Sequence, residues 1–117
     1  MVNELDKYCV RDSATMLEAI AAIQSNNSRC VVVTNDAGIV VGMFSEGDVL
    51  RALLSGVDVH TLLRNLVKPS YRYLQSRDIE AARKLIVGGL TLIPVINVEH
   101  RLQGVITLQD AFGTPRD

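Results

Sequence analysis

The composition of this chain describes a small globular unit with an aliphatic interior and a balanced charge. It has 117 residues, of which 48% are hydrophobic and only 4% aromatic, with no tryptophan, so its core must be built from Val, Ile, Leu and Ala. The 12 basic and 13 acidic residues give a net charge of −1, and they form no basic stripe of the kind that binding to a nucleic-acid backbone requires.

The sequence shows no membrane or export signal. No apolar run reaches the ~18 residues of a membrane span, and residues 1–7 carry two acids and lack the apolar stretch of a secretory signal. Cys9 and Cys30 each lie in an apolar, strand-like stretch, which favours two buried thiols over a disulfide. We therefore expect a cytoplasmic protein that has no membrane or nucleic acid as partner.

The chain repeats itself at an offset of 62 residues. The apolar run at residues 30–33 aligns with residues 92–95, and Gly42 aligns with Gly104. A repeat of this kind decides the fold, because each unit is built in the same way and the units stack on one another.

Each repeat predicts the element order β-α-β-β-α. In the first repeat, we expect a short strand at residues 8–10 and a helix at 15–25. Two strands should follow at 30–34 and 39–44, and a second helix from 46 onward. In the second repeat, the same elements are expected at residues 70–74, 78–87, 92–97, 102–107 and from 108 onward. Thr15 and Asp78 are the expected N-caps of the leading helices. Those helices end at Asn26-Asn27 and Gly88-Gly89, residue types that enter left-handed backbone conformations readily.

A linker at residues 55–60 joins the two repeats, and a helix is expected over residues 59–67 until Pro69 stops it. Each repeat has an apolar strand face too large to cover by itself. We therefore expect an α/β (α+β) fold in which residues 1–58 and 59–117 pack against each other about a pseudo-two-fold axis.

A seven-residue motif ends the second long strand of each repeat. It reads Gly42-Met43-Phe44-Ser45-Glu46-Gly47-Asp48 and recurs as Gly104-Val105-Ile106-Thr107-Leu108-Gln109-Asp110. The Ser or Thr hydroxyl is expected beside free N–H groups at a helix N-terminus, which binds phosphate. The Asp can accept two hydrogen bonds from vicinal hydroxyls, as on a ribose. The same spacing is also that of a capping box, and its occurrence twice at one offset favours the ligand-binding interpretation.

Both repeats resemble CBS (cystathionine-β-synthase) domains, and the pair resembles a Bateman module. The resemblance covers about residues 8–112, and it rests on the motif above, on Ile93-Pro94-Val95, and on the match of Leu17-Glu18-Ala19 with Ile79-Glu80-Ala81. It implies a regulatory module that is not an enzyme and requires no cofactor. In that family, an adenine nucleotide (AMP, ADP or ATP) binds in clefts between the repeats.

The resemblance also implies the site residues. Ser45 and Asp48 would serve one cleft, and Thr107 and Asp110 the other, with the Asp on the ribose. The strand residues Val32 and Pro94 occupy equivalent positions and would line the base, although the first repeat departs from the family pattern in having Val there.

Two arginines are further candidates for ligand binding. Arg51 lies one turn after Asp48 and could reach a phosphate, while a solvated helix face explains it as well. Gly113 stands at the equivalent position of the second repeat, which predicts that the two sites differ. Arg72, between two tyrosines, marks either a stacking or phosphate position near the second cleft or one side of an edge strand.

Other chemistry is not indicated. His60 and His100 are far apart in the sequence and are expected on the surface, with no metal-ligand spacing and no nucleophile beside a base. The remaining alternatives are a dimerisation module with vestigial clefts, a small enzyme, and a fragment of a nucleotidyltransferase.

The resemblance further implies partners. A homodimer is expected through apolar helix faces that include residues 52–54, and a catalytic domain is expected in the same or a neighbouring chain. Residues 45–56 resemble CBS pairs that are fused to sugar-nucleotide nucleotidyltransferases or to sugar-phosphate isomerases. The chain is therefore expected to be either part of a longer polypeptide or a free-standing module.

Overall fold

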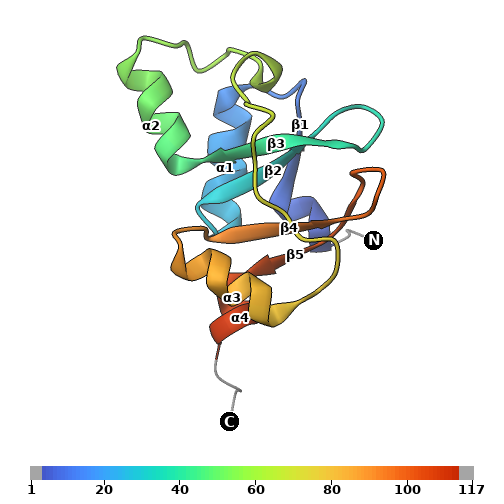
Figure 1. Ribbon diagram of the computed structural model, residues 1–117. Helices are drawn as coiled ribbons and strands as arrows, with labels where there is room; N and C mark the ends of the chain where they lie inside the picture. Colours follow the sequence, from blue (N-terminus) through green and yellow to red (C-terminus); the bar gives the residue numbers. More distant parts are fainter. Residues whose placement is uncertain (1–3, 114–117) are drawn as a thin grey trace.

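The computed structural model describes residues 4–113 as two α+β repeats that are stacked against each other (Figure 1). The first part of the chain forms the 3-10 helix η1 (Glu4–Tyr8), β1 (Cys9–Arg11), α1 (Met16–Asn26), β2 (Cys30–Thr34), β3 (Val40–Ser45) and α2 (Glu46–Leu54). The rest forms the 3-10 helix η2 (Leu63–Asn65), α3 (Ile79–Val87), β4 (Leu92–Ile96), β5 (Leu102–Thr107) and α4 (Leu108–Phe112). None of the described helices is long and apolar enough to cross a bilayer.

The strands form two small sheets. In the first, β1 pairs in parallel with β2, which pairs antiparallel with β3. In the second, β4 pairs antiparallel with β5. Figure 1 shows α3 and α4 together on the side of the second sheet that faces away from the first repeat. The sheets therefore form the middle of the molecule, and the helices cover its outer faces.

The strands β2 and β4 are buried on both faces, which explains their continuous apolar sequence. Val31 and Val33 of β2 pack against the helices of their own repeat, whereas Cys30 and Val32 point into a layer between the repeats. β4 divides its side chains in the same way, and Leu92 joins the shared layer. The predicted association of the two halves is confirmed.

Helix caps form where the sequence predicts them. The hydroxyl of Thr15 accepts a hydrogen bond from the N–H of Glu18, whose carboxylate accepts from the N–H of Thr15. The carboxylate of Asp78 accepts from the first turn of α3. The left-handed turns are found at Asn27 (φ 57°) and Gly89 (φ 117°), so the helix-to-strand connections are confirmed.

The helix predicted over residues 59–67 is wrong. Only the single 3-10 turn η2 is found there, because the backbone of this segment bonds to the start of α1 instead. The N–H of Met16 donates to the carbonyl of Thr61, and the N–H of Leu17 donates to that of Val59. Leu63 is fully buried in the core of the first repeat. The repeat boundary between residues 58 and 59 stays a prediction.

The strand predicted at residues 70–74 is reduced to one bridge, in which Leu74 pairs with Val95 in parallel. The preceding residues are drawn away from the sheet edge. Tyr71 packs into the layer between the repeats, and its hydroxyl donates a 3.3 Å hydrogen bond to the carbonyl of Val40. The second repeat therefore begins with a single bridge, whereas the first begins with the paired strand β1.

Candidate ligand-binding site

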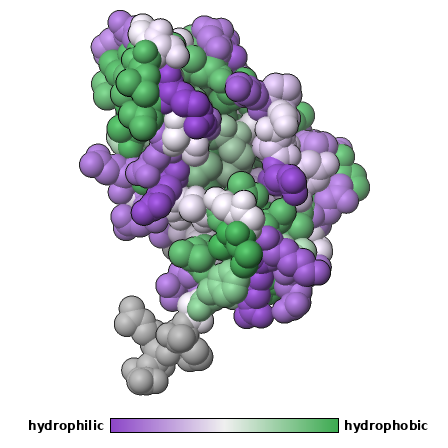
Figure 2. Space-filling view, turned by 60° about the vertical axis from the view of Figure 1, so that its left-hand side comes forward, coloured by the Kyte–Doolittle hydropathy of each residue, from purple (hydrophilic) through white to green (hydrophobic). Residues whose placement is uncertain are grey.

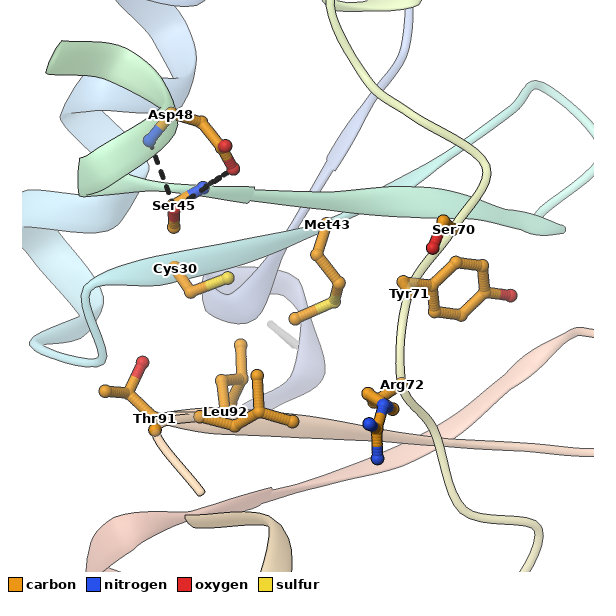
Figure 3. A pocket seen from close by; sticks show the side chains of 11 residues that line it. Cys30, Met43, Ser45, Asp48, Ser70, Tyr71, Arg72, Thr91 and Leu92 are labelled. Carbon is orange, nitrogen blue, oxygen red and sulfur yellow. Dashed lines mark hydrogen bonds between the residues drawn. The ribbon is translucent and has the colours of Figure 1, made fainter. Parts of the chain in front are cut away.

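A cavity of about 390 Å³ lies between the two repeats (Figure 3). We call it cavity 1. The first repeat contributes strand residues and the start of α2, and the second contributes the segment before α3 and the turn before β4. The lining residues are Cys30, Met43, Ser45 and Asp48 from the first repeat and residues 70–72 and 89–92 from the second. Ser45 and Asp48 lie at one end, and Arg72 lies at the other.

A second cavity, of about 560 Å³, is related to the first by the internal repeat. We call it cavity 2. It combines the start of α4 with the turn between α1 and β2, and it is lined by Tyr8, residues 26–29, Thr91 and residues 107–109. At the offset of 62, Thr107 corresponds to Ser45 and Tyr8 to Ser70. Each cavity thus takes a helix start from one repeat and a helix-to-strand turn from the other.

The repeated motif forms a capping box in both copies. The N–H of Ser45 donates to Oδ2 of Asp48 over 2.9 Å, and the N–H of Asp48 donates to Oγ of Ser45 over 3.2 Å. In the second repeat, the same bonds between Thr107 and Asp110 measure 2.9 and 3.1 Å. The capping interpretation of the motif is therefore confirmed. The binding of a ligand by the same residues stays a prediction.

The carboxylate of Asp48 is held ionised by its neighbours. Burial raises its pKa, but hydrogen bonds from the backbone N–H of Ser45, the guanidinium of Arg51 and the hydroxyl of Ser45 outweigh burial, and the pKa lies below its ordinary value. Nη2 of Arg51 lies 2.7 Å from Oδ1 of Asp48. The guanidinium is exposed and does not line cavity 1, so Arg51 acts on this site through Asp48.

The second repeat replaces that arginine by a different one. Nη2 of Arg77 lies 3.6 Å from Oδ2 of Asp110, and its Nη1 donates to the carbonyl of Val105. Gly113 stands where the first repeat has Arg51, so no arginine of α4 can pair with Asp110. Arg77, next to the N-cap of α3, supplies the positive charge instead. Sequence analysis missed Arg77, because its partner is contributed by a helix about thirty residues away.

The middle of cavity 1 is apolar. Cys30, Met43 and Leu92 lie between its two polar ends (Figure 3). Burial, together with the negative charge of Asp48, raises the pKa of the Cys30 thiol to about 12. The sulfur therefore stays a neutral thiol, and it offers an uncharged surface to a planar, apolar group.

The predicted site residues are only partly brought together. Ser45 and Asp48 line cavity 1, and so does Arg72, which was expected near the other cleft. Thr107 lines cavity 2, but Asp110 does not. Val32 and Pro94 do not line either cavity, because strands covered on both faces leave both side chains fully buried. No ligand reaches them in this conformation.

Sequence analysis missed Thr91, which lines both cavities, because its place depends on the way the repeats pack together. His60 is exposed, as predicted, but His100 is half-buried, with Nδ1 3.0 Å from the hydroxyl of Tyr71. Within residues 4–113, no cluster of His, Cys, Asp and Glu is placed to hold a metal ion.

Comparison with known protein families finds a match in the first repeat. Residues 2–55 match the model of the CBS domain. Among curated relatives, the chain is 28% identical over 102 residues to arabinose 5-phosphate isomerase GutQ of Salmonella typhi. The aligned stretch covers 86% of this chain and 32% of the relative. The chain thus spans about a third of the length of such relatives. This likeness agrees with the predicted resemblance to CBS pairs of sugar-phosphate isomerases.

Solved structures share the fold over most of the chain. The CBS domains of a transcriptional regulator from Streptococcus pneumoniae superpose with a TM-score of 0.74 at 20% identity, covering 95% of this chain and 92% of that one. A CBS domain protein from Pyrobaculum aerophilum complexed with AMP gives a TM-score of 0.70 at 20% identity, covering 93% and 89%. At 20% identity, these superpositions show that the chains share a fold, and nothing more.

Proposed function

We propose that the chain belongs to the CBS domain family and is a regulatory module that binds an adenine nucleotide between its repeats, because residues 2–55 match the CBS domain model and the fold is that of solved CBS domain pairs. The observation that carries this proposal is cavity 1, where an ionised carboxylate at a helix start adjoins an apolar floor. The AMP in the structure from Pyrobaculum aerophilum, a protein of the same fold, supports the choice of ligand.

Each end of the nucleoside has a matching surface in cavity 1. The carboxylate of Asp48 accepts from one ribose hydroxyl, and the base lies against Cys30, Met43 and Leu92. The capping bonds do not prevent this, because a carboxylate has about four lone-pair sites. The two bonds from Ser45 and the one from Arg51 orient the group and keep it charged.

The regulatory effect follows from the position of the cavity. A nucleotide that contacts both repeats favours the arrangement in which they are closed, and its differential affinity sets the effect, commonly ~1–3 kcal/mol. The chain itself performs no catalysis in this proposal. The signal passes to a catalytic domain in the same or a neighbouring chain, which the greater length of the GutQ relatives supports. Such a sensor would work in the cytoplasm, where these nucleotides are made.

We also propose that the module forms a homodimer through α1 and α2. Leu50 and Leu54 are 59% and 80% exposed. An apolar groove of about 350 Å³ runs between the two helices beside Val49 and Leu53. Figure 2 shows apolar side chains gathered in the upper part of this face, where Figure 1 places α2.

The nucleotide proposal is tested by thermal unfolding and calorimetric titration with AMP, ADP and ATP. A ligand at 100 times its Kd adds about 2.7 kcal/mol to the free energy of unfolding. Asp48→Ala should abolish that gain. Glu18→Ala is the matched control, because it breaks a capping box of the same kind on α1, away from both cavities.

Two outcomes decide between the sensor and a purely structural module. If at least one nucleotide stabilises the wild type and Glu18→Ala but leaves Asp48→Ala unchanged, the sensor function is supported. If no nucleotide has an effect at millimolar concentration, a dimerisation module with vestigial clefts is the better description. If a nucleotide stabilises both variants as it does the wild type, it binds without Asp48, and cavity 1 is not its site.

A further inference from the structure

The internal repeat relates cavity 2 to cavity 1, but the two are lined by different kinds of side chain. At the offset of 62, residues 27–29 of cavity 2 correspond to residues 89–91 of cavity 1. This wall reads Asn-Ser-Arg in cavity 2 and Gly-Leu-Thr in cavity 1. The same place in the fold is therefore polar and positively charged in one cavity and neutral in the other.

Cavity 2 lacks the carboxylate that suits cavity 1 to a ribose. Asp110, the counterpart of Asp48, does not line it, and among the described residues its charged lining residue is Arg29. Oδ2 of Asp110 accepts from the N–H of Thr107 and lies 3.6 Å from Nη2 of Arg77. The carboxylate thus serves the helix cap and an ion pair, and the charge that lines cavity 2 is positive.

Cavity 2 also lacks an apolar floor. At the offset of 62, Leu92 and Val105 stand in place of Cys30 and Met43, but both are buried in the layer between the repeats and neither lines cavity 2. This lining offers hydrogen bonds to a hydroxyl-rich ligand and little surface to a nucleobase. Most of the lining residues carry an amide or an aliphatic hydroxyl group: residues 26–28, Thr91, Thr107 and Gln109.

Thr107 offers cavity 2 a hydrogen-bond donor that Ser45 does not offer cavity 1. The hydroxyl of Ser45 donates to Oδ2 of Asp48 over 3.0 Å. The hydroxyl of Thr107 accepts from the N–H of Asp110, but within residues 4–113 its own proton has no protein acceptor. Thr107 is only 9% exposed. A buried donor without an acceptor is costly unless another group satisfies it, so this hydroxyl is available to an oxygen atom of a ligand in cavity 2.

The positive charge of cavity 2 is only loosely paired within the protein. Nε of Arg29 lies 3.9 Å from Oε1 of Glu46, and the two side chains are 74% and 62% exposed, so this contact contributes little to stability. A guanidinium binds a phosphate or a carboxylate through two parallel hydrogen bonds. Arg29 can therefore exchange Glu46 for the anionic group of a ligand.

We propose that cavity 2 is a second ligand site, which takes a small sugar that carries a phosphate or a carboxylate group. The anionic group pairs with Arg29, and one sugar oxygen accepts from the hydroxyl of Thr107. The amides of Asn27 and Gln109, which line the same cavity, can donate to and accept from further hydroxyl groups. The two cavities then respond to different classes of metabolite. This inference goes beyond the proposed function and does not depend on a nucleotide in cavity 1.

The test is calorimetric titration of ribose 5-phosphate, glucose 6-phosphate and glucuronate, with ribose and glucose as their neutral counterparts. We expect at least one charged sugar to bind the wild type at millimolar concentration or below, and its neutral counterpart to bind at least tenfold more weakly. Glucose 6-phosphate and glucuronate together show which anionic group is preferred. Arg29→Gln should weaken binding of the charged sugar by roughly tenfold, and Gln109→Ala by about threefold.

The matched control is Arg11→Gln. It removes one positive charge from the same repeat and breaks a similarly exposed ion pair, with Asp36, but Arg11 lines neither cavity. Affinity for the charged sugar should stay within a factor of two. An equal loss in Arg11→Gln and Arg29→Gln would overturn the inference, because the effect would then reflect net charge.

Titration in the presence of excess AMP separates this inference from the nucleotide proposal. Affinity for the charged sugar should stay within about threefold when AMP is bound in cavity 1. If AMP displaces the sugar competitively, or if no charged sugar binds more tightly than its neutral counterpart, the inference is wrong. If AMP, ADP and ATP all fail to bind while a charged sugar binds and depends on Arg29, the proposed function fails and the inference stands.

Discussion

The hydroxyl of Thr91, in the second repeat, donates a 2.6 Å hydrogen bond to the carbonyl oxygen of Ser28, in the first. Thr91 lines both cavities, and Ser28 is buried in the wall of cavity 2. This bond therefore joins the repeats in the wall that the two cavities share. A ligand in either cavity would contact the residue that makes it.

Thr91→Val keeps the shape of the side chain and removes the donor, which leaves the carbonyl of Ser28 without this bond. We expect the free energy of unfolding to fall by ~1 kcal/mol, measured by urea denaturation. Thr34→Val, on a partly exposed strand position, is the control and should change stability by less than ~0.5 kcal/mol. Equal effects of the two substitutions would show that the bond between the repeats contributes nothing.

The leading glycines of the repeated motif provide a second pair of substitutions. A Cβ at Gly42 would lie 2.8 Å from the backbone carbonyl oxygen of Lys68, whereas a Cβ at Gly104 would meet nothing within 4 Å. Gly42→Ala should therefore destabilise the protein by ~1–3 kcal/mol, and Gly104→Ala should stay within ~0.5 kcal/mol of the wild type. Thermal unfolding of both variants checks this. If both variants lost the same stability, the steric contact between β3 and the backbone of Lys68 would not account for the effect at Gly42.

The elements that depend on local patterns were predictable from the sequence. The cap at Thr15 and the left-handed turn at Asn27 need only neighbours a few residues away, so the limits of α1 followed from them. The segment at residues 59–67 has apolar residues at helical spacing, but its backbone bonds to α1 across the fold. A single sequence does not show that competition.

The candidate site was predictable in part for the same reason. The motif located Ser45 and Thr107 at helix starts, because a capping box is a local signal. The opposite walls come from the other repeat, so Thr91 and Arg77 emerged only from the fold. Val32 lies on the face of β2 that also carries Cys30, but the packing between the repeats buries it fully, and its role beside the base stays a prediction.

The carboxylate of Asp48 should make the free energy of unfolding depend on pH. Its folded-state pKa is lowered below the reference value of 3.8, so its charge contributes stability at pH values above the unfolded pKa. That contribution is lost as the pH falls through the folded pKa. The free energy of unfolding of the wild type should therefore decline below about pH 5, and Asp48→Asn should decline less steeply. Urea denaturation at pH 7, 5 and 3.5 measures both slopes.

A control separates this effect from general acid unfolding. Glu99→Gln removes a carboxylate that is exposed on the turn between β4 and β5 and should keep the wild-type slope. If Asp48→Asn and the wild type lose stability in parallel, the bonds from Ser45 and Arg51 do not stabilise the charged form in solution.

The proposed homodimer predicts a change of mass without a change of fold. Leu50 is 59% exposed in the single chain, so Leu50→Glu costs the folded monomer little but places two like charges in the proposed contact between copies. Sedimentation at tens of micromolar, the order of Kd expected for a weak interface, should show a wild-type dimer and a Leu50→Glu monomer with unaltered Tm. Val98→Glu, at an 85% exposed position on a distant turn, should stay dimeric. A wild-type monomer under these conditions, or a dimeric Leu50→Glu, would remove α2 from the interface.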